Sequence, residues 1–277
     1  MSQVAFWAPV RGHGAATSNV LAVSTMLALD YYARIMVTHT KRTKTALENA
    51  FGRPSSPGDN LLSFSEYGLD ALERLLQSNK LTPESIQDYT KPIVKDRLDL
   101  LPGSRKPLAD PDCFREETLP YIVNSASRYY DLTFVDVGDG YKEGSSEAIL
   151  RNSDLIVVNL SQNLELLERY FNKELWTESL QNKPLLLVLG DYDKNSRFSA
   201  VNLARKFKWK QTLYTIPHCT GYLDACSDKN LLEFFLRSRN AGPDHSSYAF
   251  ITEVRKLIKA LLNRLGLDSK LMQERGA

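Results

Sequence analysis

The chain has 277 residues, of which 43% are hydrophobic and 25% charged, and its net charge is +2. This composition is typical of a globular protein that buries a large core without disulfides. The near-neutral charge argues against a surface devoted to nucleic acid or anionic membrane. The cysteines, Cys113, Cys219 and Cys226, lack metal-ligand spacing, and no run reaches the roughly 18 apolar residues of a membrane-spanning helix. We therefore expect a cytoplasmic protein with reduced thiols.

Short apolar runs alternate with segments of helical periodicity along the whole chain. The predicted strands are 3–9, 34–40, 97–104, 131–140, 153–161, 183–191 and 211–217. The predicted helices are 17–33, 68–80, one that opens at 82–84, 112–129, 163–180, and most of the chain after 217 except the region around 240–247. This order predicts an α/β fold, a mostly parallel twisted sheet of about seven strands with helices on both faces. We expect one domain over 1–277, with a C-terminal helical segment over 246–277.

The stretch WAPVRGHGAATSN, residues 7–19, lies between the first predicted strand and the first predicted helix. In parallel α/β sheets this turn is a common phosphate site, because backbone N–H groups and the helix N-terminus favour an anion. Gly12 and Gly14 would let the backbone approach such an anion closely. Two nearby glycines also fit a plain turn, so the loop alone does not decide between these interpretations.

Three segments together resemble the ParA/MinD group of P-loop ATPases. APVRGHGAATSN is similar to the group's deviant Walker loop, S-P-K-G-G-V-G-K-T-T, with Pro9, Gly12, Gly14 and Thr17 at matching positions. DLTFVDVGDG resembles the strand that ends in D-x-P-x-G, with Asp136 at the acidic position. TIPHCTGYLDACSDKN resembles the late I-P-x-D segment, with Pro217 at its proline. The segments occur in the family's order, and the resemblance implies a P-loop NTPase-like fold over the whole chain.

Within this group the TadZ/CpaE proteins of Tad (Flp-type) pilus systems are the most similar branch. The stretch RLDLLPGS, residues 97–104, is similar to their L-x-V-L-P-G-P segment. The resemblance implies a scaffold that localises or assembles a pilus or related secretion machine, including its traffic ATPase. It also implies a homodimer that is located in the cytoplasm and can lie at the inner face of the membrane.

The Walker loop departs from the family pattern at the positions that carry its chemistry. Val10 replaces the signature lysine that reaches the partner's phosphate, and Arg11 replaces the first glycine. Ala15 replaces the Walker lysine, and Ala16 replaces the hydroxyl that ligates magnesium. Each charged hydrogen bond contributes about 1.5–3 kcal/mol, so losing two lysines weakens phosphate binding by about 3–6 kcal/mol, or roughly 10²–10⁴-fold. We therefore predict a pseudo-ATPase without hydrolysis, with at most weak ATP binding and no reliance on magnesium.

The resemblance gives a set of candidate residues for a degenerate nucleotide or anion site. They are Arg11, Gly12, His13, Gly14, Ala15, Ala16, Thr17, Asp136 and Pro217. Asp136 is also the candidate metal ligand, with the capping of a nearby turn as its alternative role. No catalytic residue is assigned. The competing hypothesis is a ParA/MinD-type positioning ATPase that binds or hydrolyses ATP and holds membrane or DNA.

Two further segments have a functional and a structural interpretation. NLARKFKWKQ, residues 202–211, alternates basic and aromatic residues, but the near-neutral total charge favours a helix end over a nucleic-acid surface. The helix predicted over 247–267 has an apolar stripe that fits either packing on the sheet or membrane contact. Its members are Phe250, Val254, Leu257, Ile258, Leu261 and Leu265.

Overall fold

The computed structural model describes residues 1–41, 45–52, 67–104, 117–138 and 144–267. Cys113, the first residues of predicted helix 112–129, the end of predicted strand 131–140 and the last ten residues of segment 246–277 lie outside the described ranges.

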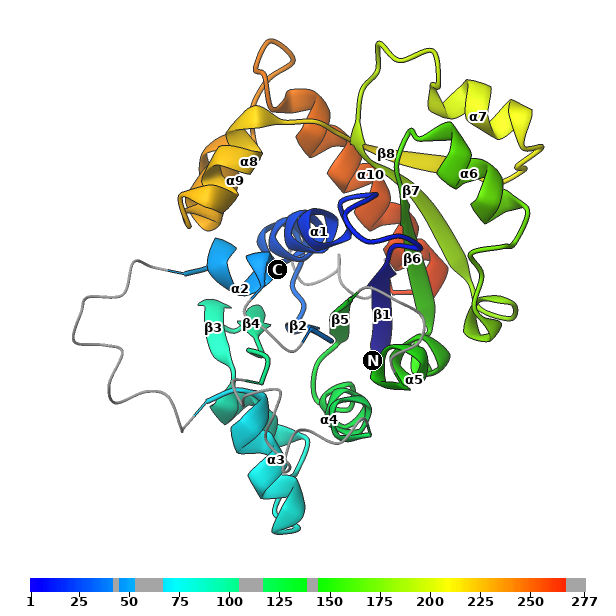
Figure 1. Cartoon of the computed structure of the whole chain (residues 1–277). Coiled ribbons are helices and arrows are strands. Elements are labelled where there is room, and N and C mark those ends of the chain that lie inside the picture. The colour runs from blue at the N-terminus through cyan, green and yellow to red at the C-terminus, as the bar shows by residue number, and fades with distance from the viewer. Residues whose placement is uncertain (42–44, 53–66, 105–116, 139–143, 268–277) are drawn as a thin grey trace.

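Eight strands form one sheet in the order β3-β4-β2-β5-β1-β6-β7-β8 (Figure 1). Every neighbouring pair is parallel except β3 and β4, which are antiparallel. The strands are β1 (Ser2–Trp7), β2 (Ile35–His39), β3 (Lys91–Val94), β4 (Leu98–Leu100), β5 (Leu132–Val137), β6 (Leu155–Leu160), β7 (Leu185–Tyr192) and β8 (Leu213–Pro217). The predicted mostly parallel sheet is confirmed, with one more strand than expected.

The additional strand, β3, lies at the edge of the sheet. It is four residues long, includes Pro92 and is partly exposed. Proline removes a backbone donor, so it is tolerated at an edge where no neighbour needs that donor. A short, half-exposed strand of this kind carries no apolar run, which is why the sequence pattern did not indicate it.

Helices cover both faces of the sheet. The α-helices are α1 (Ala16–Asp30), α2 (Ala46–Ala50), α3 (Leu69–Gln77), α4 (Thr118–Ala126), α5 (Gly144–Asn152), α6 (Leu164–Phe171), α7 (Ala200–Lys206), α8 (Thr220–Ser227), α9 (Leu231–Ser238) and α10 (Tyr248–Leu265). Two 3₁₀ helices, η1 (Glu84–Tyr89) and η2 (Glu178–Leu180), complete them. Predicted helix 163–180 thus consists of α6 followed by a turn and η2, and the break around 240–247 is confirmed.

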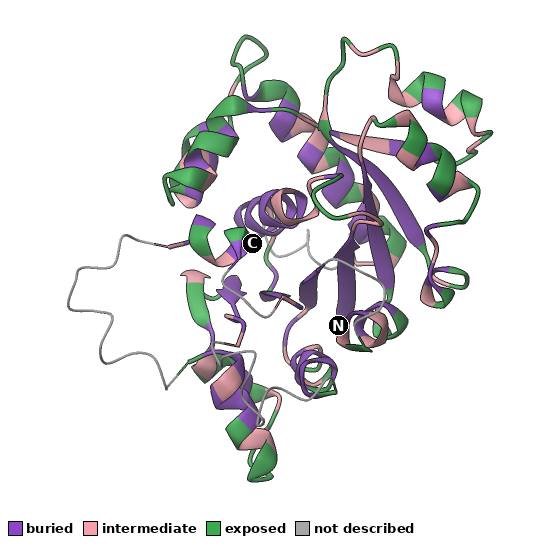
Figure 2. Cartoon of the chain, viewed as in Figure 1, coloured by how far each residue is buried: buried purple, intermediate pink, exposed green. Residues whose placement is uncertain are grey.

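Alternate residues of each strand enter two separate cores, because successive side chains point to opposite faces. Val4 and Phe6 of β1 pack with α1, α2, α8, α9 and α10, whereas Ala5 and Trp7 pack with α3, α4, α5, α6 and α7. Figure 2 shows most of the sheet and of α1 buried, with β3 exposed or partly exposed at the edge. From Asn19 to Leu29 every residue of α1 is buried, including the polar Asn19, Ser24 and Thr25.

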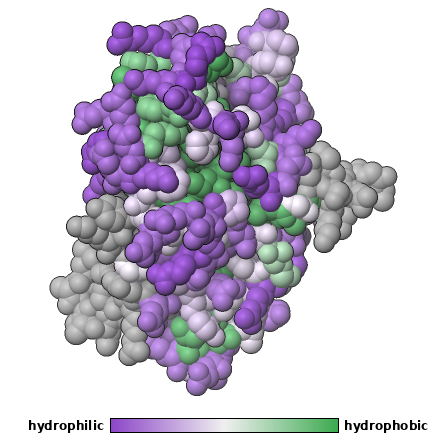
Figure 3. Space-filling model, turned by 90° about the vertical axis from the view of Figure 1, so that its right-hand side faces the viewer, coloured by the Kyte–Doolittle hydropathy of each residue, from purple (hydrophilic) through white to green (hydrophobic). Residues whose placement is uncertain are grey.

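The outer surface is mostly polar. In the face that Figure 3 turns toward the viewer, hydrophilic residues cover most of the area and hydrophobic ones gather near the centre. The large hydrophobic side chains that are exposed lie on different elements, among them Tyr32, Tyr121, Val201 and Leu236. No helix in the described ranges is both long and apolar enough to cross a membrane.

Candidate functional site

The loop between β1 and α1 has the backbone geometry of an anion cradle. Gly12 and Gly14 have φ of 72° and 84°, and Ala15 also lies in the left-handed region with φ of 55°. Helix α1 then begins at Ala16 without a side-chain cap and without an acidic residue in its first turn. The N–H groups of a first helical turn lack partners within the helix and carry partial positive charge. The start of α1 therefore has the local charge that favours an anion.

Gly14 is held against the ends of β6 and β7. A Cβ atom on Gly14 would lie 2.3 Å from the backbone oxygen of Asn159. A Cβ atom on Gly190 in β7 would lie 2.1 Å from the backbone oxygen of Gly14. Both contacts are with backbone, which cannot rotate away as a flexible side chain can. Glycine at these two positions lets the loop lie directly on the carboxyl ends of the strands.

Two buried asparagines hold the loop from below. The Nδ2 of Asn19 donates to the backbone oxygen of Gly14 at 3.1 Å and to Oδ1 of Asn159 at 2.7 Å. The Nδ2 of Asn159 donates to the backbone oxygens of Trp7 at 3.2 Å and Val157 at 2.9 Å. Both side chains are almost fully buried. Sequence reasoning missed this pair, although an asparagine within the apolar run LIVVNL was a signal for it.

Asp136 is brought to the start of α1 by the pairing of β5 with β1. It is only 1% exposed, and its Oδ2 accepts a hydrogen bond from the Thr17 hydroxyl at 2.7 Å. The sequence indicated the loss of a metal-binding hydroxyl at Ala16; the hydroxyl that lies beside Asp136 belongs to Thr17. The carboxylate and the hydroxyl thus meet at the start of α1.

Lys41, which follows β2, is a member of the same cluster that sequence reasoning missed. Its Nζ donates to Oγ1 of Thr17 at 3.2 Å and lies 3.5 Å from Oδ2 of Asp136. The sequence signal was the basic stretch THTKRTK, residues 38–44, at the end of predicted strand 34–40. A lysine therefore lies near the loop even though Val10 and Ala15 supply none.

These residues fit an anion better than a divalent metal. Magnesium is usually held by one or two carboxylates, with waters and phosphate oxygens completing its octahedral shell, so the carboxylate must be free to bind it. Here the one carboxylate, Asp136, is already bonded to Thr17 and Lys41 through the same oxygen. Elsewhere in the described ranges, no three His, Cys, Asp or Glu side chains gather as a metal site. The ammonium of Lys41 would also repel a cation placed beside Asp136.

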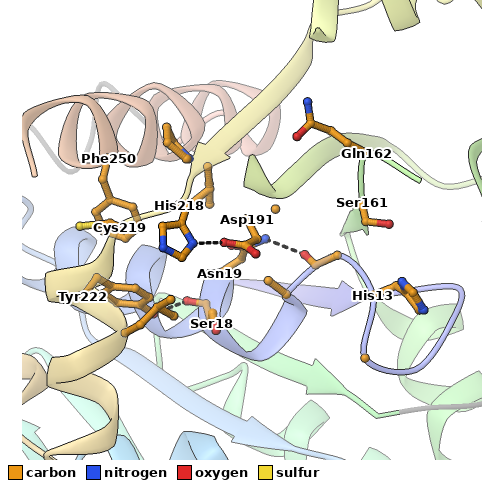
Figure 4. Close-up of a pocket in the computed structure, with 17 residues that line it drawn as sticks. His13, Ser18, Asn19, Ser161, Gln162, Asp191, His218, Cys219, Tyr222 and Phe250 are labelled. Atoms are coloured by element: carbon orange, nitrogen blue, oxygen red, sulfur yellow. Dashed lines mark hydrogen bonds and ion pairs between the residues drawn. The ribbon is translucent and has the colours of Figure 1, made fainter. Parts of the chain in front are cut away.

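Two cavities flank the loop, each with a volume near that of a small ligand site. The first, about 390 Å³, holds the Lys41 cluster; its lining includes Arg11, Gly12, Thr17, Lys41 and Asp136. The second, about 380 Å³, lies toward β7 and β8; its lining includes His13, Gly190, Asp191, Pro217 and His218 (Figure 4). The fold thus brings Pro217 to the same loop as Gly12 and Gly14, whereas Asp136 lies on the other side.

The second cavity is lined by neutral and paired side chains. Figure 4 shows His218 and Asp191 pointing toward one another, with Nδ1 and Oδ1 separated by 2.7 Å. The hydroxyl of Tyr222 donates to the backbone oxygen of Ser18, and burial raises the pKa of Tyr222 well above its usual range. Burial also raises the pKa of the nearby Cys226 thiol to about 11.

The aromatic side chains of the basic and aromatic stretch 202–211 are partly buried against the core. Helix α7 ends at Lys206, and the ring of Phe207 then stacks on that of Phe171 with centroids 4.3 Å apart. Trp209 meets Phe171 edge-on at 5.8 Å. These rings pack on the core, and single-stranded nucleic acid needs exposed ones for stacking. The stretch is thus a helix end with a packed turn.

The apolar stripe of α10 is buried in the core, which agrees with packing on the sheet, one of the two interpretations that the sequence left open. Phe250, Val254, Leu257, Ile258 and Leu261 are at most 2% exposed. They pack in the same core as α1 and β8. Only Leu265 of the predicted stripe is partly exposed. Within the described part of α10, no apolar face is left for a bilayer.

Known structures share this fold. A ParA family ATPase from Chlorobium tepidum TLS matches with a TM-score of 0.71 and 13% sequence identity, over 93% of this chain and 98% of that one. The septum site-determining protein MinD from Pyrococcus horikoshii OT3, complexed with Mg-ADP, gives 0.66 and 13% over 94% and 97%. A plasmid partition protein from Borrelia burgdorferi B31 bound to AMPPNP gives 0.60 and 15% over 95% and 99%. No family model and no curated protein sequence matches the chain. The chain therefore has the fold of the ParA and MinD ATPases.

Proposed function

We propose that residues 1–277 form a single ParA/MinD-like domain that acts in the cytoplasm as a non-catalytic scaffold, similar in role to TadZ/CpaE. Its task would be to localise or assemble a Tad/Flp-type pilus or a related secretion machine and its traffic ATPase. The observation that carries the non-catalytic part is the start of α1. Ala15 and Ala16 place only methyl groups where phosphoryl transfer needs a lysine and a hydroxyl.

Phosphoryl transfer depends on charges that stabilise the transferring group. A cation, Lys41, does lie beside Thr17 at the start of α1, but it is paired with Asp136. The carboxylate that would help to hold a metal is bonded to an ammonium instead. Both observations support binding without turnover. The assignment to a pilus system rests on the similarity of RLDLLPGS and of the degenerate loop to the TadZ/CpaE pattern.

We expect no ATP hydrolysis above background when the purified chain is incubated with ATP and magnesium, because the groups that stabilise the transferring phosphoryl are missing. Release of inorganic phosphate over several hours is the measurement, with an Asp136→Ala variant as the matched blank. Turnover in the wild-type chain that disappears in the Asp136→Ala variant would contradict the pseudo-ATPase assignment.

A second candidate function is an ATP-binding positioning ATPase. Two cavities on either side of the Gly12–Gly14 loop favour it, because together they offer room for the phosphates and the nucleoside of a nucleotide. The turnover experiment separates the two candidates. The apolar stripe of α10 is buried, so it gives no support to a form of this candidate that attaches to membrane through that helix.

We expect a scaffold to assemble without nucleotide. In the family that the loop resembles, a lysine at the position of Val10 bridges to the partner's phosphate, whereas Val10 packs against the core of this chain. Any dimer must then rest on direct protein contacts, which need to bury roughly 1,000 Å² or more. By carry-over from the family, its centre would include loop 9–17 and the turn after Asp136, of which residues 139–143 lie outside the described ranges.

Light scattering of the purified chain, with and without ATP, measures this assembly. The expected result is one mass, above that of the 31.3 kDa monomer, in both conditions. A mass that rises only on adding ATP would contradict nucleotide-independent assembly. A monomer in both conditions would leave a heterologous partner as the route to a scaffold.

A further inference from the structure

The position of Lys41 is set by the backbone around it. Strand β2 pairs with β5 so that His39 lies opposite Asp136, and the N–H of Thr40 donates to the Asp136 backbone oxygen at 3.1 Å. The Thr40 hydroxyl then accepts from the N–H of Gly138 at 2.7 Å. These bonds fix the chain on both sides of the cluster. The Lys41 stem therefore follows the end of β5 toward the start of α1.

Gly138 leaves the space that this stem uses. A Cβ atom at Gly138 would lie 2.8 Å from Cγ of Lys41. The side chain of Lys41 is 31% exposed, so its ammonium reaches the cavity while its stem lies against protein. The ammonium ends beside the hydrogen-bonded pair of the Thr17 hydroxyl and the Asp136 carboxylate. That arrangement is built by three elements, β2, β5 and α1.

We infer that the Lys41 ammonium takes the place of a divalent metal beside Asp136, and that the cavity it lines binds phosphate groups in metal-free form. This inference rests on the proposed function in one respect, since it takes the β1–α1 loop as the phosphate cradle. Lys41 is then the residue that determines selectivity for the metal-free ligand.

The charge balance explains why an ammonium is needed there. Asp136 alone would place a buried negative charge beside the start of α1 and repel a phosphate. The ammonium of Lys41 neutralises that charge at 3.5 Å and has further donors for an incoming oxygen. Arg11 lines the same cavity and adds positive charge. A divalent cation at the same carboxylate oxygen would have to displace Lys41, so added magnesium does not strengthen binding.

Calorimetry with inorganic pyrophosphate tests this on the full chain, because pyrophosphate carries the phosphates without a base. The wild type binds in EDTA, and magnesium leaves the affinity equal or lower. Lys41→Met keeps the length of the stem and removes the charge, so affinity in EDTA falls roughly 10- to 100-fold, the range of one charged hydrogen bond. Lys80→Met, at an exposed lysine after α3, is the matched control and leaves the affinity unchanged.

A second measurement follows the metal alone. Lys41→Met leaves Thr17 and Asp136 without an ammonium, so electron paramagnetic resonance of Mn²⁺ is expected to show bound ion in this variant and none in the wild type. Lys41→Arg keeps a cation and is expected to behave as the wild type. Thermal unfolding of each variant identifies a loss of fold.

Three results would overturn the inference. In the first, the wild type binds pyrophosphate only when magnesium is present. In the second, the wild type binds no pyrophosphate in either condition. In the third, a folded Lys41→Met variant gives the same result as the wild type in both measurements. The first and second results come from the wild type alone, so they test the inference even when a variant fails to fold. None of these results concerns turnover or assembly, so the scaffold proposal is tested separately, by the phosphate-release and light-scattering experiments.

Discussion

Gly14→Ala is expected to lower the free energy of unfolding by about 2–5 kcal/mol, the combined size of overpacking and of left-handed backbone strain. The added methyl would lie 2.3 Å from the Asn159 backbone oxygen, and φ at this position is +84°. Neither the added methyl nor the Asn159 backbone oxygen can rotate away, because neither belongs to a flexible side chain. The loop must therefore move off the ends of β6 and β7, which also breaks the bond from Asn19 to the Gly14 oxygen.

Gly12→Ala is the matched control for this prediction. Gly12 also has positive φ, at +72°, but a Cβ atom there would meet nothing within 4 Å. Only the backbone term remains, so the cost is about 1 kcal/mol. Thermal unfolding separates the two variants, since 1 kcal/mol corresponds to roughly 2–4 °C in a chain of this size. Equal midpoints for the two variants would contradict the close contact between Gly14 and Asn159.

The two variants also differ in the expected effect on pyrophosphate binding. The cradle depends on the placement of the first turn of α1, which Gly14 sets through its contacts with β6 and β7. Gly14→Ala should therefore abolish binding that Gly12→Ala only weakens. A Gly14→Ala variant that binds as the wild type would show that the anion lies elsewhere.

The sheet could be predicted from the sequence because its central strands are buried on both faces. LIVVNL and LLLVLG are continuous apolar runs, and only strands between two helical layers read in that way. The same logic placed the loop before α1 and Asp136 at the carboxyl ends of adjacent strands. Short elements escaped it: α2 and α5 have at most nine residues and few buried positions each.

The site could be predicted only as far as the resemblance reached. The pattern named Arg11 to Thr17, Asp136 and Pro217, and the fold brings all of them to the loop between its two cavities. Lys41 could not be found in this way, because it lies 24 residues from Thr17 in the chain and meets it only through strand pairing. Asn19 and Asn159 are separated by 140 positions, and their contact likewise depends on the tertiary structure.

Helix α10 gives the other large expected effect. Leu257 is fully buried in the core that α10 shares with α1 and β8. Leu257→Ala removes a buried side chain and leaves a cavity, which costs about 2–5 kcal/mol. Lys259→Ala, two positions along on the exposed side, is the matched control and should change stability by less than about 0.5 kcal/mol. Thermal unfolding measures both.

The wild type and the Leu257→Ala variant together also decide between core packing and membrane contact. If the stripe belongs to the core, the wild type does not sediment with anionic phospholipid vesicles, and Leu257→Ala lowers the unfolding midpoint. If the stripe served a bilayer, the wild type would sediment with vesicles, Leu257→Ala would weaken that binding, and the midpoint would hardly move. The burial of Leu257, Ile258 and Leu261 leads us to expect the first result. A membrane role for this protein would then require a partner or a segment other than the apolar stripe of α10.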